Sequence, residues 1–237
     1  MNPTNMKLSV IIPTRNEELS IKDVLINLRK EIPNGTELIV VDGNSTDKTV
    51  AIAKRYAKVI PNKGRNIASA RNTGAKTAKG DILVFVDADT KPTRIFFEKT
   101  IKAFQDKQTV CFGGLIMPTK LNAYEWLLFR TLNVIVQLSV AFGRPAIAGS
   151  CVAYRRTSFV KVKGFDEGMA ASEDQDLCNR VSKIGRVKFD SSLIIDTSNR
   201  RLRELGFWGL IVNWSGTTFN LLIGKKTTEY KLTHSVK

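Results

Sequence analysis

Two aspartates at the end of an apolar run are the residues of this sequence best suited to chemistry. Asp87 and Asp89 are separated by Ala88 and directly follow the apolar residues 82–86. On an extended strand, residues two apart share a face at roughly 6.5–7 Å, so the two charges would repel by about 2–3 kcal/mol at an effective dielectric of about 20. A divalent cation with phosphate oxygens in its shell would turn this repulsion into attraction. The pair indicates a metal–nucleotide site, and the stretch Asp-Thr-Lys-Pro is also a plausible start of a turn.

A second acidic pair, Glu173 and Asp174, lies in the stretch SEDQDL. Ser172 followed three residues later by Gln175 has the form of a capping box, which predicts a helix with both acids in its first turn. Acidic residues are ordinary partners of the helix dipole at that place. The pattern alone therefore leaves a catalytic and a purely structural role open.

The elements that must position these acids alternate along the first half of the chain. Short apolar runs at 8–13, 37–42 and 82–86 are typical of buried strands, and residues 16–32, 43–57 and 67–80 of helices, the second with Ser45 or Thr46 as its N-cap. Such alternation predicts a parallel sheet covered on both faces, with ligands at the carboxyl ends of the strands. The three strands all end in polar residues, so we expect the chemistry at that edge.

The second half of the chain is less regular. Residues 111–118 suggest a strand, 121–143 a long apolar helix, 146–159 a strand running into a turn, 172–185 a short helix, and 187–196 one or two final strands. No internal repeat or low-complexity linker divides the chain. We expect a single α/β domain over 1–202, with its two halves at about 7–115 and about 116–202. A basic, amphipathic helical region is expected over 203–237.

The charge balance limits the partners. The 237 residues include 37 Lys plus Arg and 22 Asp plus Glu, a net charge of +15, which favours an anionic partner such as a membrane surface or a phosphate-bearing molecule. Basic residues are dispersed rather than gathered in one aromatic-rich stripe, which argues against nucleic acid. Three widely spaced cysteines without a CxxC pair, together with no signal peptide or spanning segment, predict a cytoplasmic protein.

The motifs in succession resemble one known family. LSVIIPTRNEE, ELIVVDGNSTDKT, GRNIASARNTGAKTAKGDILVFVDADT, AGSCVAYRRTSFVKVKGFDE and SEDQDL resemble family 2 glycosyltransferases of the GT-A fold, across most of residues 7–205. The resemblance implies a Rossmann-like, mostly parallel sheet flanked by helices. It also implies transfer of a sugar from a nucleotide-diphosphate donor, with Mg or Mn as cofactor and inversion at the anomeric carbon.

The resemblance also implies that the half at about 7–115 binds the donor, that the half at about 116–202 serves the acceptor, and that particular residues have roles at the donor side. Asp87 would lie by the ribose or the metal, and Asp89 would be the principal metal ligand. Arg65 is preferred over Arg71 as a donor contact because it precedes an expected helix, whose N-terminus and a guanidinium both favour a diphosphate. Arg71 is equally consistent with a solvated helix residue. The other residues implied at the nucleotide sugar are Pro13, Arg15, Glu17, Ala88 and Asp42, the last of which otherwise has the role of a turn aspartate.

At the acceptor side the resemblance implies that Asp174 is the general base, with Glu173 as the alternative. Arg200 and Arg201 resemble a lid that closes over the diphosphate, and basic residues near a membrane are an equal explanation. Residues 206–224 would form a helix of about 28 Å with one apolar face. Such a helix suits a membrane interface, and packing on the domain or on a second subunit suits it as well. The apolar residues 121–143 raise the same choice and point to a lipid-linked acceptor.

Other functions remain to be weighed. A phosphatase of the haloacid dehalogenase type usually has Thr or Val four residues after its first Asp, where this chain has Lys91. A sugar-nucleotide nucleotidyltransferase needs a glycine-rich basic loop after the first strand, which TRNEELS lacks. A non-enzymatic protein that binds membrane surfaces or nucleic acid is a third class. The sugar, the nucleotide, the acceptor and the oligomeric state stay open.

Overall fold

The first half of the chain forms the parallel strands that its apolar runs predict. A computed structural model describes residues 6–118, 121–198, 200 and 203. Strands β1 (Leu8–Thr14), β2 (Glu37–Asp42), β3 (Lys58–Pro61) and β4 (Ile82–Val86) lie in the order β3-β2-β1-β4, and every neighbouring pair is parallel. Residues of β1 and β4 are buried throughout, as expected for strands covered on both faces.

The second half extends this sheet beyond β4. Strands β5 (Thr90–Lys91), β6 (Thr109–Ile116), β7 (Cys151–Arg155) and β8 (Arg186–Thr197) complete the order β3-β2-β1-β4-β7-β6-β8-β5. Strand β7 runs antiparallel to both β4 and β6, β5 runs antiparallel to β8, and β6 and β8 are parallel with an irregularity between Gly114 and Leu115. The sheet is therefore mostly parallel, as predicted, and residues 187–196 belong to one strand.

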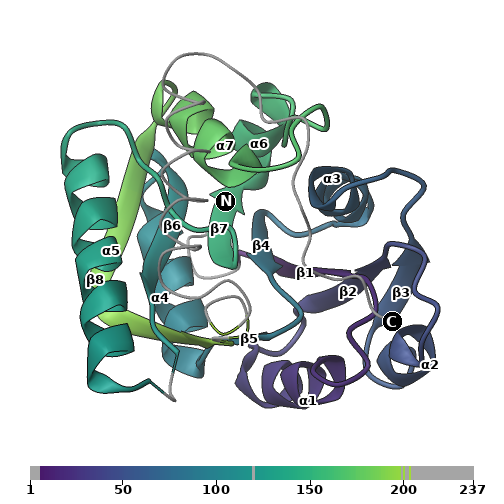
Figure 1. Cartoon of the computed structure of the whole chain (residues 1–237). Coiled ribbons are helices and arrows are strands. Elements are labelled where there is room, and N and C mark those ends of the chain that lie inside the picture. The colour runs from purple at the N-terminus through teal and green to yellow at the C-terminus, as the bar shows by residue number, and fades with distance from the viewer. Residues whose placement is uncertain (1–5, 119–120, 199, 201–202, 204–237) are drawn as a thin grey trace.

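Helices cover both faces of the sheet (Figure 1). They are α1 (Ile21–Glu31), α2 (Thr49–Ala53), α3 (Ile67–Thr77), α4 (Arg94–Gln105), α5 (Ala123–Ala141), α6 (Arg156–Lys161) and α7 (Glu173–Ser182). Alternate residues of β1 enter two separate cores. Val10 and Ile12 pack with residues of α1 and α4, and Ile11 packs with residues of α3, α6 and α7. The period-two alternation of a strand thus builds a three-layer domain.

Two local expectations are wrong or incomplete. Helix α2 begins at Thr49 after Lys48, and neither Ser45 nor Thr46 caps it. Both residues are engaged with the loop after β1 instead, since the backbone N–H of Asn16 donates to Ser45 Oγ at 2.9 Å and the N–H of Thr46 donates to Asn16 Oδ1 at 2.8 Å. Strand β3, helix α4 and the two-residue strand β5 were not predicted. The run 146–159 forms strand β7 only over Cys151–Arg155, and helix α6 (Arg156–Lys161) follows where a turn was expected.

The C-terminal region stays a prediction. Apart from Arg203, residues 203–237 lie outside the described residues, and so does the proposed boundary at 202. Within the described part of the chain, none of the helices is long and apolar enough to cross a membrane.

Candidate active site

The carboxyl ends of β1 and β2 meet at one edge of the sheet, as predicted. Thr14 and Asp42 are neighbours in the register of the two strands, and the N–H of Gly43 donates to Thr14 O at 2.8 Å. The loops that follow these strands are also joined through Asn16 and Ser45. The edge is therefore built from interlocked loops rather than from independent turns.

Asp42 has an available hydrogen-bond acceptor in this edge. Its side chain is 8% exposed, and Oδ2 accepts a hydrogen bond from the N–H of Ser45 at 3.1 Å. The other oxygen, Oδ1, is buried and has no hydrogen-bond partner among the described residues. Because buried polar atoms are nearly always satisfied, Oδ1 is a candidate acceptor for a ligand donor.

The other residues predicted at the nucleoside lie around the end of β1. Pro13 is buried within the strand, and Arg15 is exposed in the loop after it. Glu17 forms a two-pronged ion pair with Arg200, with Nη–Oε distances of 3.0 and 3.2 Å. The structure thus brings Arg200, 183 positions later in the chain, to the loop after β1, and Arg201 lies outside the described residues.

The two aspartates of the DAD stretch lie in a turn, not on an extended strand. Strand β4 ends at Val86, and the N–H of Thr90 donates to Asp87 O at 3.1 Å to close the turn. The separation expected from strand geometry therefore does not apply. Asp87 and Asp89 are partly exposed, and Ala88 between them is buried. The turn fixes both carboxylates at the carboxyl end of β4, next to the ends of β1 and β2.

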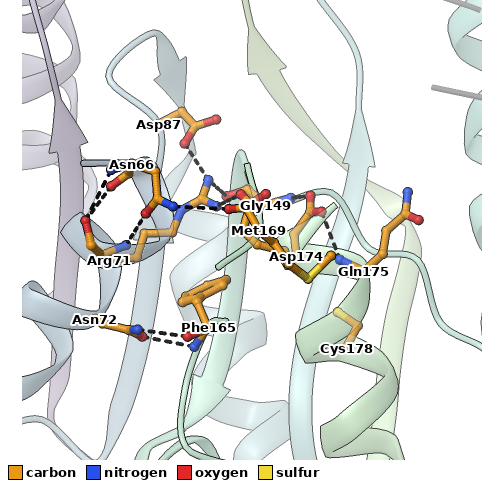
Figure 2. A network of polar contacts seen from close by, with 12 residues as sticks. Asn66, Arg71, Asn72, Asp87, Gly149, Phe165, Met169, Asp174, Gln175 and Cys178 are labelled. Atoms are coloured by element: carbon orange, nitrogen blue, oxygen red, sulfur yellow. Dashed lines mark hydrogen bonds and ion pairs between the residues drawn. The ribbon is translucent and has the colours of Figure 1, made fainter. Parts of the chain in front are cut away.

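Arg71 is a buried cation at the centre of the site (Figure 2). Its side chain is 2% exposed, and the guanidinium contacts Asp87 Oδ1 at 2.9 Å, Glu173 Oε1 at 2.6 Å and Gly149 O at 3.1 Å. Burial alone would lower the pKa of Arg71, but Asp87 and Glu173 raise it above its usual value, so the group stays charged. The reading of Arg71 as a solvated helix residue is wrong.

The preferred arginine, Arg65, has a different environment. It is exposed and lies one residue before Asn66, the N-cap of α3. Asn66 forms a capping box with Ser69, and its amide also donates to the backbone oxygens of Glu167 and Met169. Arg65 therefore lies beside a well-anchored helix N-terminus, and its contact with a donor stays a prediction.

The second acidic pair begins α7, but the predicted capping box is absent. Ser172 has a φ of 61°, in the left-handed region, and its side chain makes no cap hydrogen bond. An N-cap side chain needs an extended backbone to reach the helix N–H groups, which this conformation does not provide. Asp174 instead accepts hydrogen bonds from the N–H groups of Gly149 at 2.7 Å and Gln175 at 2.8 Å.

Glu173 and Asp174 differ in burial. Glu173 is 7% exposed and is paired with Arg71, whereas Asp174 is partly exposed. Burial and the neighbouring Asp174 raise the pKa of Glu173 to about 7, although Arg71 lowers it. The adjacent acids therefore have different environments, with Asp174 partly open to solvent and Glu173 buried beside Arg71.

Gly149 joins the two acidic groups, and sequence reasoning gave it no role. Its carbonyl accepts from Arg71 and its N–H donates to Asp174, so one residue is held from both sides. A Cβ at this position would lie 3.0 Å from both terminal guanidinium nitrogens of Arg71 and from the Cβ of Asp174. The one signal in the sequence was the stretch AGSC, which contributes to the family resemblance.

Within the described residues, no group of three or more His, Cys, Asp and Glu side chains is arranged to hold a metal ion. The oxygens of Asp87 and Asp89 suit a hard divalent cation whose remaining ligands come from a diphosphate.

Comparison with known families decides where this arrangement belongs. The model of the family described as "Glycosyl transferase family 2" matches residues 9–162. The chain belongs to this family. Membership in glycosyl transferase family 2 supports a transferase. It leaves the phosphatase and nucleotidyltransferase hypotheses without support.

Curated relatives of this family 2 chain carry glycosyltransferase names. A probable glycosyltransferase of Bacillus subtilis, YdaM, is 30% identical over 202 residues, which cover 76% of this chain and 47% of that protein. A Methanococcus voltae protein named as a dolichyl N-acetyl-alpha-D-glucosaminyl phosphate 3-beta-D-2,3-diacetamido-2,3-dideoxy-beta-D-glucuronosyltransferase is 33% identical over 168 residues, 64% of this chain and 49% of that protein. The chain spans about half the length of these relatives.

Solved structures confirm the GT-A fold. The mannosyltransferase PcManGT of Pyrobaculum calidifontis, solved with GDP-mannose and Mn²⁺, superposes with a TM-score of 0.71 at 20% identity, over 96% of this chain and 67% of that chain. Glucosyl-3-phosphoglycerate synthase of Mycobacterium tuberculosis, solved with Mn²⁺, UDP-glucose and phosphoglyceric acid, gives a TM-score of 0.67 at 21% identity, over 98% and 85%. At 20% and 21% identity, this structural similarity supports the fold alone.

Proposed function

We propose that this chain is an inverting glycosyltransferase that moves a sugar from a UDP- or GDP-sugar to an acceptor hydroxyl. One observation carries the proposal: the connected set Asp87, Arg71, Gly149 and Asp174 joins the turn after β4 to the start of α7. In this set Asp87, the acid proposed for the donor, has a fixed position relative to Asp174, the acid proposed for the acceptor. Single displacement requires that relation, because the attacking oxygen and the leaving diphosphate lie on opposite sides of C1.

The donor is proposed to bind across the carboxyl ends of β1, β2 and β4. The buried Oδ1 of Asp42 is available to accept from the base, and Arg15 and Glu17 lie in the loop after β1, which is joined to the loop after β2 through Asn16 and Ser45. Asp87 and Asp89 are the proposed ligands of Mg or Mn, which when bound would neutralise the diphosphate. Arg65 and the lid arginines Arg200 and Arg201 are the proposed additional cations, and Pro13 and Ala88 shape the floor.

Arg71 acts differently from the other arginines in this proposal. Its terminal nitrogens already bond Asp87, Glu173 and Gly149, so it supports the donor through Asp87 rather than by direct contact. The bond to Oδ1 of Asp87 orients that carboxylate, whose side chain remains 30% exposed toward the solvent edge. A buried charge held by three partners is a rigid support for such a group.

The acceptor hydroxyl is proposed to lose its proton to Asp174 as its oxygen attacks C1 opposite the diphosphate. Hydrogen bonds from Gly149 and Gln175 orient the Asp174 carboxylate, and its partial exposure leaves it accessible. General-base assistance of this kind contributes roughly 10²–10⁴-fold. Glu173, the alternative base, is buried and ion-paired, which favours Asp174.

The acceptor is proposed to be lipid-linked, and the protein to associate peripherally with the cytoplasmic face of a membrane. The dolichyl phosphate named in the Methanococcus voltae relative supports this class of acceptor. The basic balance of the chain, +15, adds attraction to anionic lipids. The predicted amphipathic region 203–237 fits the same surface.

A thermal-shift panel of UDP, GDP and their sugars, each with Mn or Mg, tests the donor half of this proposal. Ligands that bind the folded protein stabilise it by about 2.7 kcal/mol at one hundred times Kd. At least one nucleotide is expected to raise Tm in the presence of metal, and both EDTA and Asp89→Ala are expected to remove the shift. If no nucleotide raises Tm, or if Asp89→Ala keeps the full shift, the proposed donor site is wrong.

A further inference from the structure

Helix α5 turns most of its large apolar side chains away from the protein. The exposed side chains on α5 and directly after it range from 47% to 81% exposure, and they are Tyr124, Trp126, Leu127, Val134, Ile135, Leu138 and Phe142. In a helix that only covers a core, side chains of this kind face inward. Apolar groups gathered on one exposed helix mark an interaction surface. We call these seven residues the α5 apolar face.

The opposite side of α5 is fixed to the sheet. Leu128 is buried, and the side chain of the buried Asn133 bonds the N–H of Ile116 at 3.1 Å and its carbonyl at 2.9 Å, at the end of β6. Val136 and Val140 pack against the core. Figure 1 shows α5 at the outer edge of the domain beside β8. The helix is therefore held lengthwise, and its 19 residues present the apolar face over about 28 Å.

The charge of the chain favours a lipid surface over a second copy of the chain as the partner that covers this face. The one acidic residue of helix α5, Glu125, lies outside this face and accepts a hydrogen bond from the N–H of Asn122, the N-cap of the helix. Arg130 stacks over Trp126 at 5.3 Å, and Arg144 is exposed just beyond the helix. A second copy would bring two molecules of net charge +15 together, whereas an anionic lipid surface attracts each of them. Tryptophan, tyrosine and arginine beside aliphatic residues are the composition of an interfacial helix.

We propose that the α5 apolar face docks on a bilayer that carries anionic phospholipids, with α5 lying in the plane of the interface. Along the sequence, the end of the docked helix is close to the candidate active site. Phe142 precedes Gly149 by seven residues, so the two lie at most about 25 Å apart. A bilayer at Phe142 would present a lipid-linked acceptor within reach of Asp174. That last step rests on the proposed function, but docking itself does not.

Vesicle flotation of the full chain tests docking without any turnover. Wild type is expected to float with vesicles of phosphatidylcholine plus about one third phosphatidylglycerol, and to float less with phosphatidylcholine alone. Ile135→Glu/Leu138→Glu places two charges on exposed positions of the face and is expected to lower the bound-to-free ratio at least tenfold. Ile95→Glu is the matched control, because Ile95 is a 56% exposed apolar residue on α4; it is expected to float as wild type does. Circular dichroism checks that all variants are folded.

Two outcomes would overturn the proposal. One is unchanged flotation of the double variant, which would assign any binding to another part of the chain. The other is a concentration-dependent dimer that the same double substitution dissociates, which would assign the face to a second copy.

Tryptophan quenching locates the contact. Trp208→Phe/Trp214→Phe leaves Trp126 as the only one of the three tryptophans. Lipids brominated on their acyl chains are expected to quench this variant on anionic vesicles, and an absence of quenching would contradict insertion of α5. Loss of donor binding in the thermal-shift panel would leave both membrane results unchanged, so failure of the two proposals is distinguishable.

Discussion

At the scale of single residues, the site depends on one buried cation shared between two acids. Arg71 pairs with Asp87 and Glu173 at once, and solvent screening is weak around the buried Arg71 and Glu173. Removing one partner of such a buried set leaves another charge uncompensated, which typically costs about 3–5 kcal/mol. Arg71 is therefore expected to be a structural requirement of the site, in addition to its proposed support of the donor through Asp87.

The raised pKa of Glu173 gives a pH dependence that can be measured. The pKa of Glu173 is about 7 in the folded protein, whereas the ordinary pKa of a glutamate side chain is 4.5. Between these values the folded state binds more protons than the unfolded state, so the free energy of unfolding falls as pH rises.

Urea unfolding from pH 4.5 to 7.5 is expected to show this fall in wild type and a flatter profile in Glu173→Gln. Glu98→Gln, an exposed glutamate on α4, is the control; equal profiles for all three proteins would contradict the assignment.

Sequence reasoning predicted some of these residues and misjudged others for physical reasons. Asp87, Asp89 and Asp174 could be found because acidic residues at a strand end or a helix start are visible locally. The burial of Arg71 could not, since it depends on Glu173, 102 positions away. The role of Gly149 likewise depends on contacts at separations of 78 and 25 positions.

At the scale of elements, the site needs α3, α7 and the segment before β7 to meet at one point. α3 supplies Arg71, α7 supplies Glu173 and Asp174, and Gly149 lies two residues before β7. The N–H of Asp87 also donates to Ser150 O at 2.9 Å, which joins the turn after β4 to the same segment. The residues just before β7 therefore set the spacing between the acids.

Gly149→Ala tests this spacing. The added Cβ would lie 3.0 Å from Arg71 and from the Cβ of Asp174, so the backbone or both side chains must move. Overpacking of this kind costs about 1–3 kcal/mol. We expect that loss in urea unfolding together with a reduced rate of donor turnover. Gly168→Ala is the matched control, because its Cβ would meet one carboxylate oxygen at 3.2 Å. Wild-type stability and rate in Gly149→Ala would show that the segment does not set the geometry.

The elements themselves were predictable to different degrees. Continuous apolar runs located β1, β2 and β4 almost to the residue, because strands buried on both faces need such runs. The start of α7 was predicted from Ser172 and Gln175, and the left-handed backbone of Ser172 shows that the local pattern was overridden. Strand β5 has two residues and is paired only with the end of β8, so no local periodicity could reveal it.

At the scale of the whole molecule, the sheet brings distant segments to a single edge. Parallel order places the ends of β1, β2 and β4 together, and the reversal of β7 returns the chain from α5 to the same place. The α/β class and this edge followed from the sequence. The outward apolar face of α5 did not, because its composition fits a buried helix and a surface helix equally well.

Asp174 is proposed to activate the acceptor at a site where Asp87 and Asp89 hold the donor. The most direct measurement is release of nucleoside diphosphate, with Mn, from the donor that gives the largest thermal shift, with water as the acceptor. Asp174→Asn is expected to slow release by at least about 10²-fold while it keeps the thermal shift of wild type. Asp176→Asn, two residues along α7 and paired with Arg180, is expected to release at the wild-type rate. A wild-type rate in Asp174→Asn would contradict the account.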